Sequence, residues 1–223
     1  AYLLLLYIGE GGGSTKVVKK SVPDGSYDNK IRGWGIIDRY GFGALSIIGV
    51  IDGAGRSGFL TFLPFMLIEK GADVEIVGMA LTLTFIGGAT GKFFCGMLAE
   101  KLGIIRTVVL TEAITGLGIL ALLPLPLYWG MALLPLIGIG LNGTSSVLYG
   151  TVSDFVAPER RARGFGLFYT LAVGGSALAP FVFGMFSDMM GVAVTLNLVA
   201  LLSLSTIPIC KLLVGPLRRI QEV

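Results

Sequence analysis

The sequence predicts an all-α membrane protein with six transmembrane helices, on the strength of two observations. First, 54% of the 223 residues are hydrophobic and only 14% are charged, whereas soluble domains carry about 25% charged residues. Second, six apolar stretches follow one another between residues 41 and 215, and about 20 apolar residues suffice to span a bilayer as a helix. The chain has too little polar surface to cover these stretches in water.

The composition excludes several kinds of active site. The chain contains no histidine, which removes imidazole metal ligands, Ser-His-Asp triads and the usual near-neutral proton acceptor. Cys95 and Cys210 both lie in apolar stretches, so we expect neither a disulfide framework nor a redox motif. The net charge of +3 does not indicate a nucleic-acid partner, because the basic residues cluster at helix ends. We therefore expect no enzyme and no cofactor, and any proton relay has to use carboxylates.

The chain is expected to divide into four parts. Residues 1–8 are apolar but too short to cross a bilayer, and no basic segment precedes them as in a signal peptide. We interpret them as the tail of a preceding transmembrane helix. Residues 9–40 are polar and rich in Gly, Ser and Lys, which is typical of a linker. Residues 41–215 form the six-helix bundle, and residues 216–223 a cytoplasmic tail.

The spans follow in order, joined by short connections that make neighbouring helices antiparallel. They are predicted at 41–68, 76–98, 105–127, 129–150, 164–186 and 192–214. The first carries Asp52 and Arg56, the second Lys92, and the third Glu112. The fourth contains the polar stretch 142–146.

Lysine and arginine set the expected orientation. Fourteen of the 17 basic residues fall on the side of the bundle that holds the linker and the C-terminus. They are Lys16, Lys19, Lys20, Lys30, Arg32, Arg39, Lys101, Arg106, Arg160, Arg161, Arg163, Lys211, Arg218 and Arg219. Only Lys70 falls on the other side, and two lie within spans. The positive-inside rule then places both ends in the cytoplasm.

A pattern of glycine and an acid occurs twice, between the second and third spans and between the fifth and sixth. Its members are Gly96, Glu100 and Gly103, and then Gly184, Asp188 and Gly191. Every member is displaced by 88 residues. The first copy is predicted on the cytoplasmic side and the second outside, which indicates two inverted three-helix repeats, as in several secondary transporters. The alternative is a chance recurrence of Gly and acid in turns.

Three stretches carry a family resemblance: 96–103 (GMLAEKLG), 157–166 (APERRARGFG) and 51–65. The first resembles the loop motif Gly-x-x-x-Asp-Arg-x-Gly-Arg-Arg of major facilitator superfamily transporters, with Glu for Asp, Lys for Arg, and Ile104-Ile105 in place of the arginine pair. The second is similar to the cytoplasmic motif before the eleventh helix of the full-length fold. The third looks like the seventh helix of bacterial drug and metabolite exporters.

The resemblance covers about residues 41–214 and implies the C-terminal half of a twelve-helix transporter fold. The family's cavity lies between two halves, so the expected partner is an N-terminal six-helix half or a second chain. By likeness, the function would be proton-coupled export of a small organic molecule or drug by alternating access. The expected location is a cell membrane, in bacteria the inner one, and no cofactor is implied.

Four charged residues inside the spans are candidates for a proton or substrate pathway. Asp52 and Arg56 are four residues apart and therefore on one helical face; they could line the cavity or form a structural ion pair. Lys92 and Glu112 lie at similar depths in consecutive spans, which would allow them to pair. A charge at the centre of a bilayer costs at least about 2.5–3.5 kcal/mol, so it tends to be kept where it has a role.

Two further groups are candidates. In the fourth span, Asn142 and Ser145, with Thr144 and Ser146, could bond a substrate or only their own helix backbone. The loop groups would serve in gating, through salt bridges to the other half, or only in setting topology. The gating candidates are Gly96, Glu100, Gly103, Asp154, Glu159, Arg160, Arg161 and Arg163. The competing function is a non-transporting membrane assembly or receptor subunit whose buried charges are structural.

Overall fold

The computed structural model divides the chain into residues 1–32 and 33–223, and it describes residues 33–221. The predicted tail of an earlier helix at 1–8 and most of the predicted linker at 9–40 lie outside the described residues. Within the described range the chain is helical and has no β-strand beyond one isolated bridge between Ile36 and Val156. The predicted all-α class is confirmed.

The helices follow the predicted spans closely. They are α2 (Arg39–Glu69), α3 (Val74–Leu102), α4 (Ile104–Leu122), α5 (Leu127–Val152), the 3-10 turn η1 (Pro158–Arg160), α6 (Arg161–Met190), α7 (Val192–Ile209) and α8 (Lys211–Gln221). In the part of the chain that the structure describes, five helical segments are long and apolar enough to cross a membrane. α2 is not among them, although it has 31 residues. Asp52 and Arg56 in its middle lower its hydropathy.

Two predicted boundaries differ from the structure because of proline. The third span was expected to reach residue 127, but α4 ends at Leu122. The segment that follows contains Pro124, and Pro126 is the N-cap of α5, where a proline's missing N–H costs nothing. The sixth span was expected to be continuous to residue 214, but it divides at Cys210, just after Pro208.

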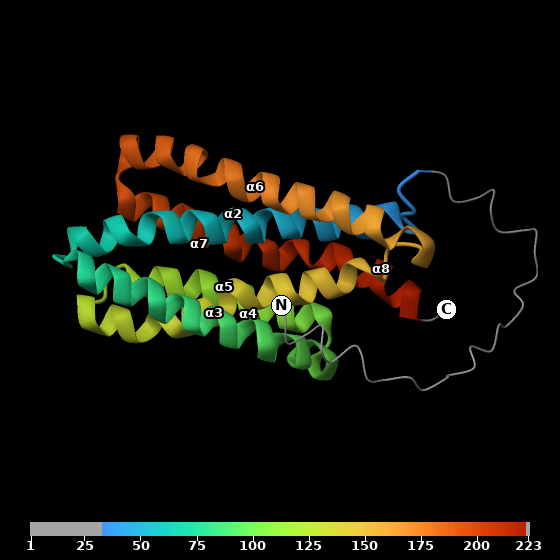
Figure 1. Cartoon of the computed structure of the whole chain (residues 1–223), viewed down its shortest axis with the longest axis horizontal. Helices are drawn as coiled ribbons and strands as arrows, with labels where there is room; N and C mark the ends of the chain where they lie inside the picture. The colour runs from blue at the N-terminus through green and yellow to red at the C-terminus, as the bar shows by residue number, and fades with distance from the viewer. Residues whose placement is uncertain (1–32, 222–223) are drawn as a thin grey trace, which may run out of the picture. The chain divides into compact units, whose positions relative to one another are not determined.

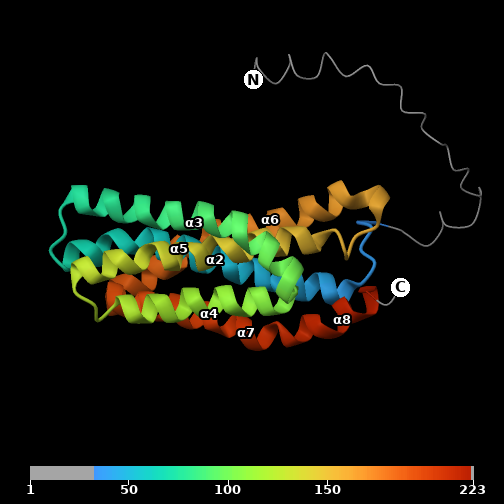
Figure 2. The same ribbon diagram turned by 90° about the horizontal axis from the view of Figure 1, so that it is seen from below.

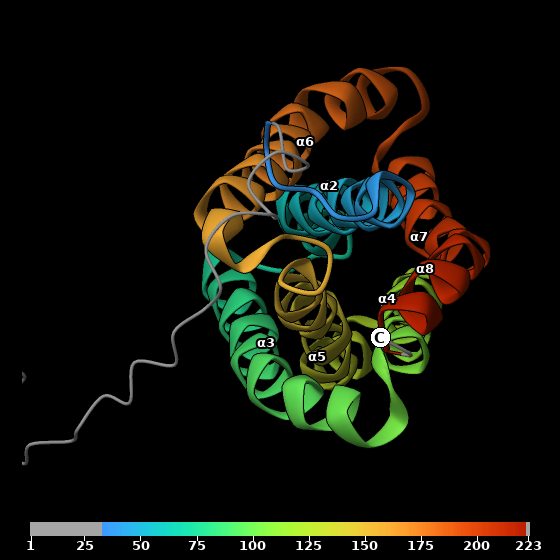
Figure 3. The same ribbon diagram turned by 90° about the vertical axis from the view of Figure 1, so that its right-hand side faces the viewer.

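The six membrane helices form two interlocked groups of three. Seen along the helices, α2 and α5 lie at the centre, with α6 and α7 beside α2 and α3 and α4 beside α5 (Figure 3). α2 packs mainly against α6 and α7, α5 packs mainly against α3 and α4, and α4 and α7 pack against each other. Consecutive helices such as α3 and α4 touch much less than these pairs. Exchanging α2, α3, α4 for α5, α6, α7 reproduces the same set of neighbours.

The two three-helix units are inverted. The α3–α4 turn lies at the same end of the bundle as the start of α2, the α5–α6 loop and α8, whereas the α6–α7 turn lies at the opposite end (Figures 1 and 2). The two turns have the same backbone conformation: Gly103 has φ 88° and ψ 154°, and Gly191 has φ 86° and ψ 164°. A positive φ favours glycine at both positions.

The residues that follow these turns are also equivalent. The hydroxyl of Thr107 donates to the carbonyl of Gly103 at 3.0 Å, and the hydroxyl of Thr195 donates to the carbonyl of Gly191 at 3.0 Å. Both threonines are fully buried and are again 88 residues apart. The predicted inverted repeat is therefore present in the fold down to the capping of its helices.

A second, unpredicted correspondence joins α2 and α5. Each helix carries a glycine triplet with the spacing Gly-x-Gly-x-x-Gly. The triplets are Gly53, Gly55 and Gly58 in α2, and Gly138, Gly140 and Gly143 in α5. Their offset is 85 residues rather than 88, because the connection from α5 to α6 is longer than that from α2 to α3. Small residues at these positions let membrane helices approach closely.

The glycine triplets face equivalent residues of the neighbouring helices. A Cβ at Gly53 would lie 2.9 Å from the carbonyl oxygen of Ala172, and one at Gly138 would overlap the carbonyl oxygen of Thr84. Ala172 and Thr84 are 88 residues apart. The remaining pairs behave in the same way. Gly55 faces Ser203 as Gly140 faces Thr115, and Gly58 faces Phe183 and Val199 as Gly143 faces Cys95 and Thr111.

Candidate functional site

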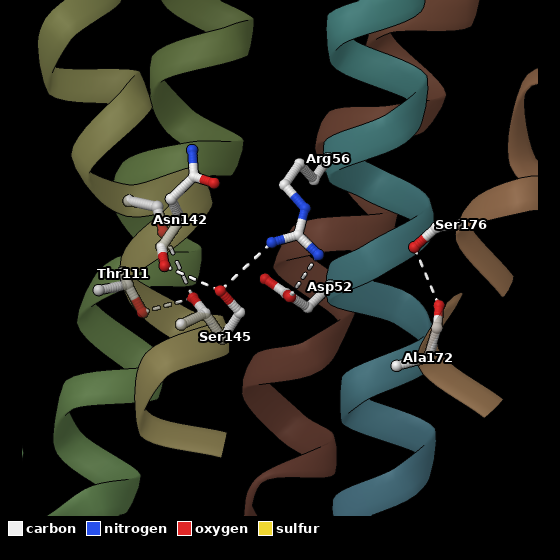
Figure 4. Close-up of polar contacts among 9 residues, drawn as sticks. Asp52, Arg56, Thr111, Asn142, Ser145, Ala172 and Ser176 are labelled. Atoms are coloured by element: carbon white, nitrogen blue, oxygen red, sulfur yellow. Dashed lines mark hydrogen bonds and ion pairs between the residues drawn. The ribbon is translucent and has the colours of Figure 1, made fainter. Parts of the chain in front are cut away.

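The candidate site lies where the two central helices meet. On α2, the guanidinium of Arg56 is 3.8 Å from the carboxylate of Asp52, one turn earlier. The same guanidinium donates a hydrogen bond of 3.2 Å to the hydroxyl of Ser145 on α5 (Figure 4). The Asp52 side chain is 5% exposed, whereas that of Arg56 is 23% exposed. The predicted Asp52–Arg56 face is thus a cross-helix contact with one partly accessible end.

Glu112 joins this cluster from α4. Its side chain is buried at 2% exposure, and its charge interacts with those of Asp52 and Arg56. One carboxylate oxygen, Oε2, has no hydrogen-bond partner within the described residues. Two carboxyl groups and one guanidinium therefore share a buried volume, which leaves one negative charge in excess when both acids are ionised. An uncompensated charge of this kind is costly in a membrane interior.

Hydroxyl groups line the boundary between α4 and α5. Thr111 and Thr144 are hydrogen-bonded at 2.7 Å, and both are buried. Ser145 donates to the backbone carbonyl of Asn142 at 2.9 Å while it accepts from Arg56. Of these, only Thr111 was absent from the predicted set. Its position one residue before Glu112 was the signal that could have pointed to it.

The predicted pairing of Lys92 with Glu112 is absent from the described residues. Lys92 is exposed on α3, and the one ion pair found between residues 33 and 221 is Asp52–Arg56. α3 turns its buried stripe, which includes Gly87, Gly88 and Gly91, toward α5, and Glu112 faces inward from α4. Equal depth does not bring two side chains together when both helices pack on a third.

Lys92 nevertheless lies beside the polar stretch of α5. Gly88, one turn before Lys92, packs against the side-chain amide of Asn142. Residues four apart lie on the same side of a helix. Lys92 therefore occupies the edge of α3 nearest Asn142, on the exposed surface of the bundle.

The gating candidates gather at one end of the bundle. The segment before α2 pairs with the loop between α5 and α6 through the bridge between Ile36 and Val156. The amide of Ile37 donates to Phe155 at 2.9 Å, and the amide of Ala157 donates to Gly35 at 2.8 Å. Arg160 adds a hydrogen bond from its guanidinium to the carbonyl of Gly33. These contacts tie the entry of α2 to the α5–α6 loop.

The other loop candidates point to solvent. The exposed residues are Glu100, Asp154, Glu159, Arg161 and Arg163. Partial burial raises the pKa of Asp154, and the nearby Arg161 opposes this rise. None of the five forms an ion pair within 4 Å among residues 33–221, so their charges remain available to another surface.

The opposite end of the bundle is held by Lys70, which the sequence analysis did not single out. Its ammonium group donates to the carbonyls of Leu122 and Leu123 at 2.9 and 2.8 Å, and also to that of Leu125. These carbonyls lie at and just after the C-terminus of α4, where four backbone acceptors lack helical partners. Burial lowers the pKa of Lys70. Lys70 thus joins the end of α2 to the α4–α5 connection.

Replacing Lys70 with methionine should destabilise the protein by about 2 kcal/mol, because buried carbonyls lose charge-assisted hydrogen bonds. Thermal unfolding in detergent measures the change. Lys101→Met is the matched control, since Lys101 is exposed at the end of α3 and a surface substitution changes stability by about 0.5 kcal/mol or less. Equal melting of the two variants would contradict the proposed role of Lys70.

Comparison with known proteins identifies relatives. The sequence model described as "Major Facilitator Superfamily" matches residues 45–221. A "Putative metabolite transport protein" of Haemophilus influenzae is 32% identical over 155 residues, which are 64% of this chain and 37% of that protein. The sialic acid transporter NanX of Escherichia coli is 28% identical over 145 residues, 61% of this chain and 35% of that protein.

A third relative, the uncharacterized transporter YhjX of the superfamily from Escherichia coli, is 29% identical over 99 residues, 44% of this chain and 25% of that protein. The matched region thus spans about a third of the length of the first two relatives and less of the third.

Proposed function

This chain belongs to the Major Facilitator Superfamily, and we propose that it forms the C-terminal half of a secondary transporter. In this proposal the six-helix bundle is a multi-pass membrane unit that moves against an N-terminal half or a second chain, by alternating access. The substrate is a small organic molecule, and the direction is export of a drug or metabolite. The names of two relatives, for metabolite and sialic acid transport, support a metabolite.

Proton coupling is proposed from one observation, the burial of Glu112 beside Asp52 and Arg56. The cluster is neutral only when one of the two carboxyl groups carries a proton. Neutrality matters because desolvation favours the uncharged state of an acid. A proton that enters the cluster, and leaves it when the surroundings become hydrated, would link its movement to that of a substrate.

Arg56 supplies the proposed link to the substrate. Its guanidinium is divided between Asp52 and Ser145 and is partly exposed. Protonation of Asp52 would release Arg56 from its ion pair and leave it free to bind a carboxylate, for which guanidinium is well shaped. Asn142 and Lys92, which lie on the neighbouring edge of the bundle, would provide further polar contacts.

The proposed orientation has both ends in the cytoplasm, in bacteria at the inner membrane. The start of α2, the α3–α4 turn, the α5–α6 loop and α8 share one end of the bundle (Figure 1). Most lysines and arginines of the described residues belong to that end, as the positive-inside rule requires. The exposed Glu159, Arg161 and Arg163 would there form salt bridges with the other half and close the inward gate.

Transport in proteoliposomes tests the proposal. The complete transporter is reconstituted, a pH gradient is imposed, and flux of labelled candidate substrates is measured for wild type and for Glu112→Gln and Asp52→Asn. We expect gradient-driven flux to fall about tenfold or more in at least one variant, which corresponds to about 1.4 kcal/mol. Glu75→Gln is the control, because Glu75 is exposed at the start of α3.

Substrate exchange without a pH gradient separates coupling from binding. The proposal expects Glu112→Gln to retain exchange while it loses gradient-driven accumulation. Absence of flux in the wild type, or unchanged flux in both acid variants, would contradict the mechanism. The competing proposal, a non-transporting assembly or receptor subunit, is favoured by the Arg56–Ser145 contact, which joins α2 to α5 as a purely structural bond would.

A further inference from the structure

An apolar cavity lies on the side of α2 away from the charged cluster. Its volume is about 390 Å³, and it is enclosed by α6 and α7 with α2 as its floor. Every lining residue is apolar or glycine, and the argument below uses Ala54, Gly175, Leu178, Phe186, Leu198 and Leu202. With no polar group in the wall, the cavity offers no hydrogen bond to water or to a polar substrate.

The cavity lies at hydrocarbon depth. Phe186 and Leu178 precede Gly191, in the α6–α7 turn, by 5 and 13 residues, and Leu198 and Leu202 follow it by 7 and 11 residues. At 1.5 Å per residue these positions are about 7 to 20 Å from the turn. One leaflet of a bilayer contributes roughly 15 Å of hydrocarbon. The cavity therefore spans most of the leaflet on the side of the α6–α7 turn.

The charged cluster and the cavity use opposite faces of α2. Ala54 is two residues from both Asp52 and Arg56, which places it about 200° away around a helix with 3.6 residues per turn. Asp52 and Arg56 face α5, whereas Ala54 faces α6 and α7. The cavity is thus separate from the proposed substrate pathway and open toward the lipid.

The inverted repeat shows how the cavity arises. By the 85-residue offset of the glycine triplets, Ala54 corresponds to Ile139 of α5, and by the 88-residue offset Val182 corresponds to Phe94 of α3. Larger side chains therefore occupy the floor and one wall in the other repeat, although Phe183 is larger than its counterpart Cys95. The same backbone geometry accommodates isoleucine at the floor position, so the space above Ala54 is a property of this residue.

We propose that this cavity binds one acyl chain of a membrane phospholipid. At about 30 Å³ for a group of the size of a water molecule, the volume accommodates on the order of a dozen methylene-sized groups. The bilayer supplies hydrocarbon at this depth, and an empty cavity would forfeit the dispersion contacts of its lining. The proposal rests on the membrane placement of α6 and α7 and is independent of the transport activity.

Photo-crosslinking tests the proposal. The complete protein is reconstituted with a phospholipid whose acyl chain carries a photoreactive group, and the cross-linked peptides are mapped by mass spectrometry. We expect enrichment at Leu178, Phe186 and Leu198. Ala54→Ile should lower the yield at these positions about fivefold or more, because extra methyl groups overpack an occupied site. Ala177→Ile is the control, since Ala177 is exposed on α6 outside the cavity.

Each outcome decides the proposal. Lipid cross-links at the cavity that are lost in Ala54→Ile and kept in Ala177→Ile support it. Equal yields in both variants, or no enrichment over other exposed residues of α6, would overturn it. Protein–protein cross-links at these residues in place of lipid cross-links would show that a second copy of the chain covers the cavity, and would overturn it as well. Equal thermal unfolding of the two variants excludes loss of folding as the cause.

Discussion

Gly138→Ala is expected to destabilise the bundle by about 3 kcal/mol. A Cβ at Gly138 would overlap the carbonyl oxygen of Thr84 and lie 3.0 Å from the backbone nitrogen of Gly88. Both obstacles are backbone atoms of α3, so relief requires α3 and α5 to move apart. Overpacking of a close interface costs about 1–3 kcal/mol and sometimes more, and the α3–α5 contact is the most extensive in the bundle.

Thermal unfolding of the purified protein in detergent measures this effect. Gly174→Ala is the matched control, because a Cβ at Gly174 in the interior of α6 meets nothing within 4 Å. There alanine should be neutral or stabilise the helix by about 0.5–1 kcal/mol. Gly53→Ala should be milder than Gly138→Ala, since the nearest atom to its Cβ belongs to the movable side chain of Ser176. Melting of Gly138→Ala at the wild-type temperature would show that the helices separate without cost.

The sequence predicted one half of the internal symmetry and missed the other. The pattern around Gly103 and Gly191 was visible because its glycines and acids share one offset, and the structure shows why glycine is needed there. The glycine triplets of α2 and α5 were missed because a difference in loop length shifts their offset to 85 residues. A search at a single period cannot find two registers. The helix–helix contacts that the triplets make also depend on helix rotation, which hydropathy does not encode.

The candidate site was predicted in part for a related reason. A charge in an apolar stretch is visible in the sequence, so Asp52, Arg56 and Glu112 were identified. The partner of Glu112 was wrong, because depth along a helix follows from residue number whereas azimuth follows from packing. α4 packs on α5 and α7 rather than on α3, and this turns Glu112 toward α2 and leaves Lys92 exposed.

The charged cluster also determines the second large effect. Arg56→Met is expected to destabilise the protein by about 3 kcal/mol, because it leaves the carboxylate of Asp52 buried without its ion-pair partner. Loss of one member of a buried pair costs about 3–5 kcal/mol, and the lower end applies here since the Arg56 side chain is 23% exposed. The double variant Asp52→Leu/Arg56→Met removes both charges and should recover most of the stability, as apolar replacement of a buried pair is often neutral.

The double variant also separates the two proposed functions. If the charges serve transport, Asp52→Leu/Arg56→Met should unfold near the wild-type temperature and yet lose gradient-driven flux, because it has neither the acid nor the guanidinium of the proposed exchange. If the charges only hold α2 against α5, restored stability should restore activity with it. Full flux in the stable double variant would therefore refute the coupling role of Asp52 and Arg56, and would leave Glu112 as the one buried acid of the cluster able to carry a proton.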